Sequence, residues 1–349
     1  MKKGYSRIII LSIVAILICT SGVFAQTDSN IKVGFAIRTL DSPYYVALGD
    51  AIKAGCEELG WEVSVLDANT DSEKEAQNMD ALVAQGVDLI FLDSVIPDPA
   101  VAVINKAAEN NIGVINLDSG VGEGAKDITT IYSNNEQNGR LVGLAYANSI
   151  DKNDPIKAIL LSGNKGSIAG EQRRTGLFCG IIEARTGLSE ADAWIAAKDM
   201  EKQLVENGKA ENTEANFVIG GQGWGAWTRE GGLEAAEDLI TANQDLTCVL
   251  AENDQMNFGA MIALENAGIE NVDILSAADG AKQAYDLIKE GKYFATGENS
   301  PVKIAEKGIE IAKAILIDGA DMWSYPDITF TEAFAVTIDN VDEHYDFGF

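Results

Sequence analysis

The sequence predicts an α/β fold of two doubly wound parallel-sheet lobes. Three observations favour it: short apolar segments alternate with amphipathic ones, the alternation occurs in two comparable series, and no linker rich in proline or serine separates the series. Short apolar strands that alternate with helices are typical of parallel sheets covered on both faces. Because the halves lack a linker, we expect short hinge crossings between them and a ligand cleft at their junction.

The first series of elements ends near residue 117. It predicts strands at 31–36, 62–67, 89–92 and 113–117, and helices at 44–59, 72–85 and 100–110. Pro43 stands in the first turn of the first helix, where the N–H that it lacks would have no partner. Asp67 to Asp71 resembles the beginning of a calcium loop, but Ser72 and Asn78 stand where that loop needs glycine and glutamate. We therefore expect this cluster to begin a helix and to bind no metal.

The second series begins near residue 157. It predicts strands at 157–161, 247–251 and 272–276, a short strand before Glu298, and helices at 171–183, 229–241 and 254–267. The glycine-rich stretch 220–225 fits neither the phosphate-binding loop nor the dinucleotide fingerprint, so we expect a loop that approaches the cleft. The charged segment 188–217 is expected to be a surface elaboration.

Composition excludes one class of partner. The 349 residues are 46% apolar, and 54 acidic side chains face 26 basic ones, for a net charge of -28. This balance is typical of a globular protein and repels phosphate backbones, so we expect no nucleic-acid binding.

The first 25 residues have the features of a cleaved signal peptide. Lys2, Lys3 and Arg7 precede an apolar run at 8–19, and small residues at 23 and 25 favour cleavage before Gln26. The run is short for a membrane-spanning helix, and an uncleaved anchor is the alternative. Ile18 before Cys19 argues against lipid attachment at that cysteine. We expect a free protein in the periplasm.

Hydrolytic and metal chemistry are poorly supported by the sequence. His344 is the only histidine, and no Gly-x-Ser-x-Gly motif occurs. Cys56, Cys179 and Cys248 are widely spaced in apolar segments, which indicates buried free thiols rather than disulfides or a zinc site. We expect no catalytic residues, no metal and no cofactor, so the protein is predicted not to be an enzyme.

Polar and aromatic side chains follow the predicted strands. They occur after the strand that ends near residue 36, after Leu117, before the helix at 171–183, and after Ala251 and Ser276. Ligands of open parallel sheets lie outside the carboxyl ends of the strands. Carboxylates and amides bind hydroxyls, and aromatic faces cover apolar C–H groups, so this mixture suits a polyhydroxylated ligand.

Several motifs resemble, in a fixed order, those of the periplasmic ribose-binding and glucose/galactose-binding proteins, the solute receptors of sugar ABC transporters. The motifs are Thr39-Leu-Asp-Ser-Pro-Tyr-Tyr45, Val114-Ile-Asn-Leu-Asp118, Arg173-Arg-Thr-Gly176, Ala251-Glu-Asn-Asp-Gln-Met256, Ser276-Ala-Ala-Asp-Gly280 and Thr296-Gly-Glu-Asn299. Together they cover nearly the whole chain after the signal peptide, which makes the resemblance specific.

The resemblance implies a set of ligand-binding residues: Arg38, Asp41, Ser42, Tyr44, Tyr45, Asp118, Arg173, Trp227, Asn253, Asp279 and Asn299. Tyr44 and Tyr45 match positions that stack on the sugar. Arg38 stands where ribose receptors have a small polar residue, Ser119 replaces an arginine and Ala278 an aromatic residue. These departures argue against ribose itself. Arg174, next to Arg173, is expected to form a surface ion pair.

The resemblance also implies an organisation and a function. One lobe would comprise residues 30–132 and 300–330, and the other 133–299 and 331–349. A monomer would capture a sugar by hinge closure and deliver it to an ABC permease in the membrane. The alternatives are a sugar or autoinducer receptor that feeds a chemotaxis or sensor pathway, and an exported Rossmann-like enzyme. A repressor with the same core is opposed by the signal peptide and the acidity.

The sequence leaves the ligand open among monosaccharides, amino sugars and polyols. An excess of expected cleft carboxylates over arginines permits an amino sugar; they are Asp41, Asp118, Glu252, Asp279 and Glu298, against Arg38 and Arg173. Trp227 and Asn299 resemble the hexose receptors more than the ribose receptors.

Overall fold

The structure is a computed structural model that describes residues 31–349. The predicted signal peptide and the prediction about Cys19 lie outside the described residues. None of the helices within 31–349 is both long and apolar enough to cross a membrane.

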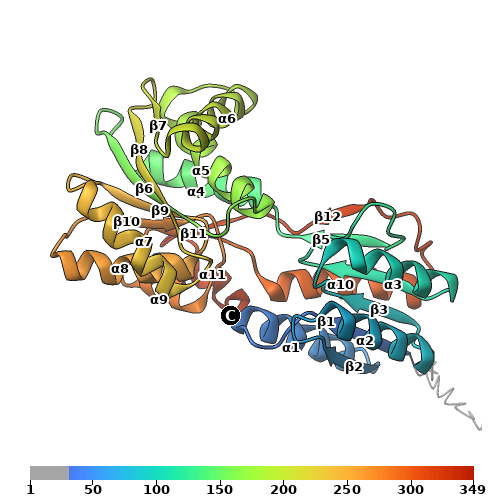
Figure 1. Cartoon of the computed structure of the whole chain (residues 1–349). Coiled ribbons are helices and arrows are strands. Elements are labelled where there is room, and N and C mark those ends of the chain that lie inside the picture. Colours follow the sequence, from blue (N-terminus) through green and yellow to red (C-terminus); the bar gives the residue numbers. More distant parts are fainter. Residues whose placement is uncertain (1–30) are drawn as a thin grey trace, which may run out of the picture. The chain divides into compact units, whose positions relative to one another are not determined.

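The first sheet has six strands, all parallel, in the order β12-β5-β4-β3-β1-β2 (Figure 1). Its strands are β1 (Lys32–Ile37), β2 (Glu62–Asp67), β3 (Leu89–Leu92), β4 (Gly113–Leu117), β5 (Thr129–Tyr132) and β12 (Ile328–Phe330). The helices packed on it are α1 (Pro43–Glu58), α2 (Ser72–Gln85), α3 (Pro97–Glu109) and α10 (Pro301–Leu316). The predicted elements of the first series are confirmed to within a few residues.

The second sheet has seven strands in the order β13-β11-β10-β9-β6-β8-β7, and its two edge strands, β13 and β7, are antiparallel to their neighbours. Its strands are β6 (Ile156–Ser162), β7 (Ala210–Asn212), β8 (Phe217–Trp224), β9 (Cys248–Ala251), β10 (Asp273–Ser276), β11 (Ala295–Gly297) and β13 (Ala335–Val336). Its helices are α4 (Asn135–Ser149), α5 (Ile168–Thr186), α6 (Glu190–Asn207), α7 (Arg229–Ala242), α8 (Asp254–Ala267), α9 (Lys282–Lys289) and α11 (Val341–His344), followed by a 3₁₀ turn (Tyr345–Phe347). The predicted α/β fold with two mainly parallel sheets is confirmed.

Alternate residues of each buried strand pack against helices on opposite faces. In the first sheet, Phe35 and Phe91 lie in the core with α1 and α10, whereas Ala36 and Ile90 lie in the core with α2 and α3. The second sheet is likewise covered by α4, α5 and α6 on one face and by α7, α8 and α9 on the other. Strands buried on both faces are apolar throughout, which is why the sequence showed short continuous apolar runs.

The chain passes between the sheets three times: from β5 to β6, from β11 to β12 and from β12 to β13. Local sequence also fixes where helices begin, both within a half and at a crossing. Asp71 caps α2, with its carboxylate accepting from the N–H of Glu73 at 2.8 Å, as expected for a helix start. Ser300 caps α10 after the second crossing, and Pro301 begins that helix.

Two predictions about the second half are wrong. The glycine-rich stretch 220–225 is mostly strand β8 rather than a loop; its glycines let α7 pack closely, because a Cβ at Gly221 would lie 2.6 Å from the side chain of Leu239. The segment 188–217 is more than a surface elaboration. It forms α6 and β7, and α6 buries Ala197, Met200 and Leu204 in the core.

Candidate functional site

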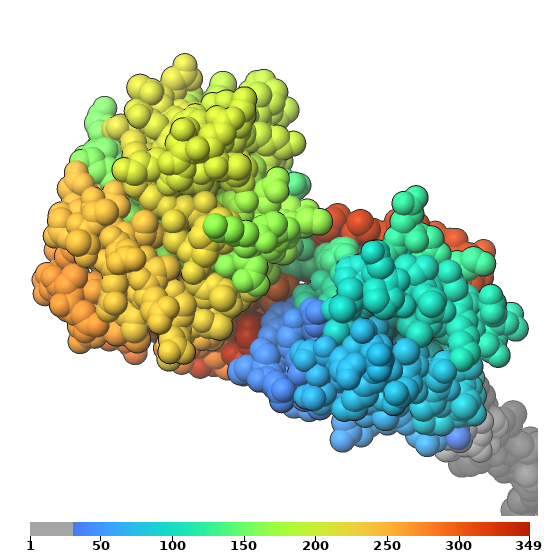
Figure 2. Space-filling model, viewed as in Figure 1, coloured from blue at the N-terminus to red at the C-terminus, as the bar shows by residue number. Residues whose placement is uncertain are grey.

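A cavity of about 660 Å³ lies at the carboxyl ends of strands from both sheets, within the size range of small-molecule sites. Figure 2 shows the outer surface of the chain's two halves where they adjoin. Ten of the eleven residues predicted to bind a ligand line this cavity: Arg38, Ser42, Tyr44, Tyr45, Asp118, Arg173, Trp227, Asn253, Asp279 and Asn299. Their contact with a ligand stays a prediction, but the structure brings them together.

The wall from the first sheet is built around Tyr44 and Asp118. Tyr44 lies in the first turn of α1, and its hydroxyl donates to Oδ1 of Asp118 at 2.6 Å. Asp118 follows β4 with a left-handed backbone, φ 60°. Aspartate tolerates that conformation better than most residues, and such backbone outliers cluster at functional sites.

Arg38 holds the neighbouring part of this wall. Its Nη2 donates to the carbonyl of Val95 at 2.9 Å, and its Nη1 donates to Oγ of Ser119 at 3.1 Å and to the hydroxyl of Tyr45 at 3.3 Å. Ser119 in turn donates to Oδ1 of the buried Asp93. Arg38 and Ser119, two of the three positions noted as departures from the ribose receptors, are therefore in contact with each other.

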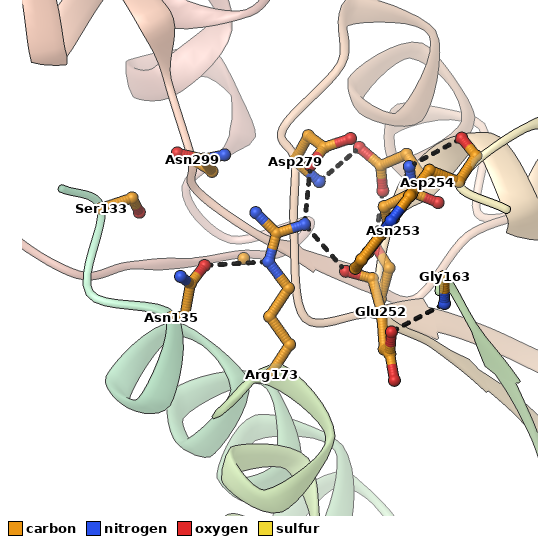
Figure 3. A network of polar contacts seen from close by, with 12 residues as sticks. Ser133, Asn135, Gly163, Arg173, Glu252, Asn253, Asp254, Asp279 and Asn299 are labelled. Carbon is orange, nitrogen blue, oxygen red and sulfur yellow. Dashed lines mark hydrogen bonds and ion pairs between the residues drawn. The ribbon is translucent and has the colours of Figure 1, made fainter. Parts of the chain in front are cut away.

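The wall from the second sheet centres on Arg173 of α5. Its Nε donates to Oδ1 of Asn135 at 2.8 Å, and its Nη1 donates to Oδ1 of Asp279 at 3.2 Å and to the carbonyl of Glu252 at 3.3 Å (Figure 3). The guanidinium also lies 5.5 Å from the ring centroid of Trp227, within cation–π range. Arg173 is thus held in the cleft by the protein's own side chains and backbone.

Trp227 lies flat against the backbone after β6. Its φ of 64° is left-handed, and a Cβ at Gly163 would collide with its indole ring. Its carbonyl accepts a hydrogen bond from Nδ2 of Asn253 at 3.2 Å. The requirement for glycine at position 163 indicates that the ring position is built into the fold.

Asp254 supports the cleft from behind. This buried carboxylate accepts from the N–H groups of Gly280 and Ala281, both at 2.9 Å, from Oγ of Ser276 at 2.5 Å and from the hydroxyl of Tyr293 at 2.9 Å. The loop that carries Asp279 is therefore anchored by a neighbouring buried acid.

Burial governs the electrostatics of the two cleft acids. It raises the pKa of Asp279 to about 6, although Arg173 opposes the shift, and the carboxylates of Asp254 and Asp118 add to it. It also raises the pKa of Asp118, against the lowering effects of Tyr44 and Arg173. Both acids would gain from hydrogen-bond donors supplied by a ligand.

Four expectations about charged residues need correction or comment. Asp41 is exposed and does not line the cavity. Glu252 and Glu298, expected as cleft carboxylates, are buried and paired elsewhere: Glu252 with Arg174 at 2.9 Å, and Glu298 with Lys303 and with His344 at 2.8 Å. Arg174 is not a surface residue; it is buried and also pairs with Glu201 of α6 at 2.5 Å. The acidic excess in the cavity is accordingly smaller than the sequence suggested.

The cavity also has lining residues that sequence reasoning missed, among them Ser94, Tyr132, Ser133, Asn135, Ser167, Gln255 and Phe349. Several follow strands or begin helices that were not predicted in detail. Ser133 and Asn135, for example, lie at the crossing from β5 to α4. No local sequence pattern could identify Phe349 as a lining residue, because its position depends on how residues 337–349 fold against the rest of the chain.

The arrangement suits a neutral polyhydroxylated molecule. Two acids, four amides and two arginines supply donors and acceptors, while Tyr44, Tyr45 and Trp227 supply apolar faces. Within residues 31–349, no three acidic, cysteine or histidine side chains are grouped to hold a metal ion, and the only histidine is paired with Glu298 outside the cavity lining. Cys56, Cys179 and Cys248 are buried free thiols, as predicted.

The chain is similar in sequence to known binding proteins. Residues 33–321 match the family described as Periplasmic binding protein domain. The ribose import binding protein of Salmonella typhimurium is 26% identical over 315 residues, which cover 90% of this chain and 95% of that protein. The relatives are binding proteins rather than enzymes.

Solved structures agree in fold. A solute-binding protein of an ABC transporter from Mycobacterium smegmatis, with bound glycerol, is 27% identical, with a TM-score of 0.67 and coverage of 90% of this chain and 96% of that one. A periplasmic solute-binding protein from Actinobacillus succinogenes, with bound D-allose, is 20% identical and matches the fold with a TM-score of 0.71, over 90% of this chain and 99% of that one. Because the family match spans most of the sequence, the chain belongs to the periplasmic binding protein domain family.

Proposed function

We propose that this protein is the solute-binding component of a sugar ABC importer, and that it captures a monosaccharide or polyol in the cavity. The observation that carries the proposal is the convergence of ten predicted residues, from both sheets, on one cavity. Family membership supports it, because the ribose import binding protein belongs among the relatives. Hydroxyl groups would satisfy the cavity acids and amides, and the aromatic rings would cover the C–H faces.

The mechanism we propose is closure of two lobes around the ligand. One lobe would comprise residues 30–132 and 300–330, and the other 133–299 and 331–349. The three passages between the sheets support these boundaries, since each lies at or next to one of them. A ligand that contacts Asp118 on one side and Asp279 on the other stabilises the closed state by its differential affinity for that state.

The charged side chains that line the cavity indicate the class of ligand. With Asp41, Glu252 and Glu298 outside the lining, Asp118 and Asp279 face Arg38 and Arg173. Two acids against two arginines favour a neutral sugar over an amino sugar. The contact between Arg38 and Ser119 reorganises a region in which ribose receptors carry a different pair, which favours a ligand other than ribose.

A thermal-shift screen tests the binding function. Residues 26–349, stripped of bound ligand by unfolding and refolding, would be screened against pentoses, hexoses, amino sugars, polyols, nucleosides and autoinducers. A sugar or polyol that binds the native state raises the melting temperature by mass action. We expect Asp279→Ala to abolish that shift and Asp41→Ala, a matched change outside the cavity, to preserve it. No shift with any polyhydroxylated compound would contradict the function.

Location and partner need separate tests. We propose cleavage before Gln26 and release into the periplasm, for which N-terminal sequencing of the protein from a periplasmic fraction is the direct test. We also propose a permease as the membrane partner. Stimulation of the ATPase of a reconstituted importer by the ligand-loaded protein would support a permease, whereas binding to a chemoreceptor alone would favour the sensor alternative.

A further inference from the structure

Phe349 is the one aromatic residue of the cavity that comes from neither a strand end nor a helix start. It lies at the end of residues 337–349, here called the tail segment. After β13 the tail segment forms α11 and a 3₁₀ turn, and it reaches the beginning of α1 (Figure 1). In Figure 2 its red surface lies next to the blue surface of the first half.

Contacts with the second half hold the tail segment in place. Val341 is buried in the same core cluster as residues of α9. The hydroxyl of Tyr345 donates to Oδ1 of Asp286 at 2.9 Å, and the N–H of Lys282 donates to the carbonyl of Phe349 at 3.1 Å. Gly348 packs so closely on α9 that a Cβ there would lie 2.9 Å from the ring of Tyr285.

Contacts at the crossing into α10 hold it from the other side. Oγ of Ser300 donates to the carbonyl of Phe347 at 2.7 Å, and Nζ of Lys303 lies 4.5 Å from the Phe347 ring centroid. His344 lies 2.8 Å from the buried carboxylate of Glu298, which Lys303 also contacts. The backbone next to Phe349 is therefore held by α9 on one side and by the beginning of α10 on the other.

The ring of Phe349 packs against the first half of the molecule. Its centroid lies 5.3 Å from that of Tyr44, with the rings at 89°, an edge-to-face arrangement. Tyr44 in turn donates to Asp118 and lies 3.4 Å from Oδ1 of Asn299. Phe349 is among the residues that line the cavity of about 660 Å³, so it forms part of the wall and does not fill the site.

We propose that Phe349 is a ligand-contacting residue, whose ring covers the C–H face of a cyclic sugar or cyclitol while Asp118 and Asn299 bind its hydroxyls. The inference rests on the proposed function and deepens it, because it assigns one wall of the site to the tail segment. Because α9 and the beginning of α10 hold the tail segment, the ring can contact a ligand at little cost in conformational entropy on binding.

The test uses residues 26–349 and isothermal titration with D-ribose, D-allose, L-arabinose and myo-inositol. The wild-type protein and three variants, Phe349→Ala, Phe349→Leu and Phe349→Tyr, are compared with Phe347→Ala. Phe347 is a matched control, because it lies two residues away on the tail segment and outside the cavity lining. Melting temperatures of the ligand-free proteins report any loss of packing.

We expect Phe349→Ala to weaken binding of the best probe about tenfold. Phe349→Leu should lose nearly as much, because it lacks an aromatic face, whereas Phe349→Tyr should stay within about threefold of wild type. Phe347→Ala should lower the melting temperature but change affinity less than about threefold.

Three results would overturn the proposal. Unchanged or tighter binding by Phe349→Ala would mean that the ring makes no favourable ligand contact. An equal loss in Phe347→Ala would mean that the tail segment acts only by supporting the fold. If the wild-type protein binds neither these probes nor any sugar or polyol of the thermal-shift panel, the proposed function fails and the inference fails with it; the wild-type titration distinguishes that outcome from the first two.

Discussion

The two walls of the cavity are built differently. On the first-sheet side, Tyr44 donates to Asp118, while Arg38 donates to Tyr45, to Ser119 and to a backbone carbonyl; one buried acid, Asp93, accepts from Ser119 behind them. On the second-sheet side, Arg173 and Asp279 stand in front of the buried acids Glu252 and Asp254, which are themselves fully paired. The second wall therefore has its geometry fixed by two buried acids with several partners each, while the first depends more on contacts among its own side chains.

This difference assigns the walls different parts in recognition. A preorganised set of donors and acceptors loses little entropy on binding and penalises a ligand that leaves a buried group unpaired. We therefore expect the second wall to select the pattern of ligand hydroxyls. The first wall supplies apolar area around Asp118 through Tyr44 and Tyr45, and Phe349 of the tail segment packs edge-to-face against Tyr44.

The largest effect is expected from removing the support of the second wall. Asp254→Ala would leave three backbone N–H groups and two hydroxyls without their buried acceptor. We expect the free energy of unfolding to fall by about 3 kcal/mol, measured by urea denaturation. Asp50→Ala, an exposed change on α1, should stay within about 0.5 kcal/mol of wild type. A small loss for Asp254→Ala would remove the distinction between the walls.

The next largest effect concerns ligand affinity. Asp279→Ala should weaken binding of the best probe by about 2 to 3 kcal/mol, since Arg173 would lose its carboxylate and the ligand an acceptor. Asp118→Ala should cost about 1 to 2 kcal/mol, because its wall is less fixed. Titration calorimetry of both variants decides the matter. A greater loss in Asp118→Ala would reverse the assignment of the walls.

A pH dependence of about tenfold should follow from Asp279. Its pKa of about 6 lies above the usual value, so the ligand-free folded state holds this proton more tightly than the unfolded state does. Its contribution to stability is therefore present below about pH 4 and is lost as the pH rises through about 6. A ligand that donates to the carboxylate lowers this pKa, so affinity should rise about fivefold from pH 5 to 6, reach about tenfold in all near pH 7 and level off above that.

The pH prediction is checked by titrating the same probe at half-unit intervals from pH 5 to 8. Asp279→Asn is the matched control, because it keeps the shape of the side chain and removes the titration. We expect that variant to bind weakly with a flatter profile. A wild-type affinity that is constant over this range would show that the cavity does not use the ionised form of Asp279.

The smallest effect should come from Arg38. Arg38→Ala removes contacts with Tyr45, Ser119 and Val95, but the side chain is only partly buried and its wall is less fixed. We expect a two- to fivefold loss of affinity, about 0.5 to 1 kcal/mol. Arg38→Lys keeps the charge but loses the fork of donors, so its affinity should lie between those of the wild-type protein and Arg38→Ala. A loss as large as that of Asp279→Ala would show that both walls are equally specific.

Sequence reasoning reached much of the fold because its strands are buried on both faces. The apolar run 89–92 could be assigned from composition alone, and it forms β3. Reasoning failed at β8, where glycines that allow α7 to pack closely have the appearance of a loop. It also passed over α6, whose apolar stripe is narrow and whose charged residues include Glu201, the buried partner of Arg174.

The site was predictable where a residue follows a strand in a known order of motifs, as Asp118 and Asp279 do. It was not predictable where partners distant in the sequence determine whether a side chain lines the cavity. Glu252 and Glu298 also follow strands, yet each meets a basic residue from a helix and leaves the cavity lining. Phe349 reaches the cavity only because Glu298, Ser300 and α9 hold the tail segment.

The most direct test of the account is calorimetric titration of ligand-stripped protein, residues 26–349, with the sugar or polyol that gives the largest thermal shift, in wild type and in Asp279→Ala. The account predicts one ligand per chain with saturable heat for the wild-type protein, and a loss of about 30-fold or more in the variant. Wild-type binding that Asp279→Ala leaves unchanged would place the ligand elsewhere and contradict the central claim, as would the absence of binding by any sugar or polyol.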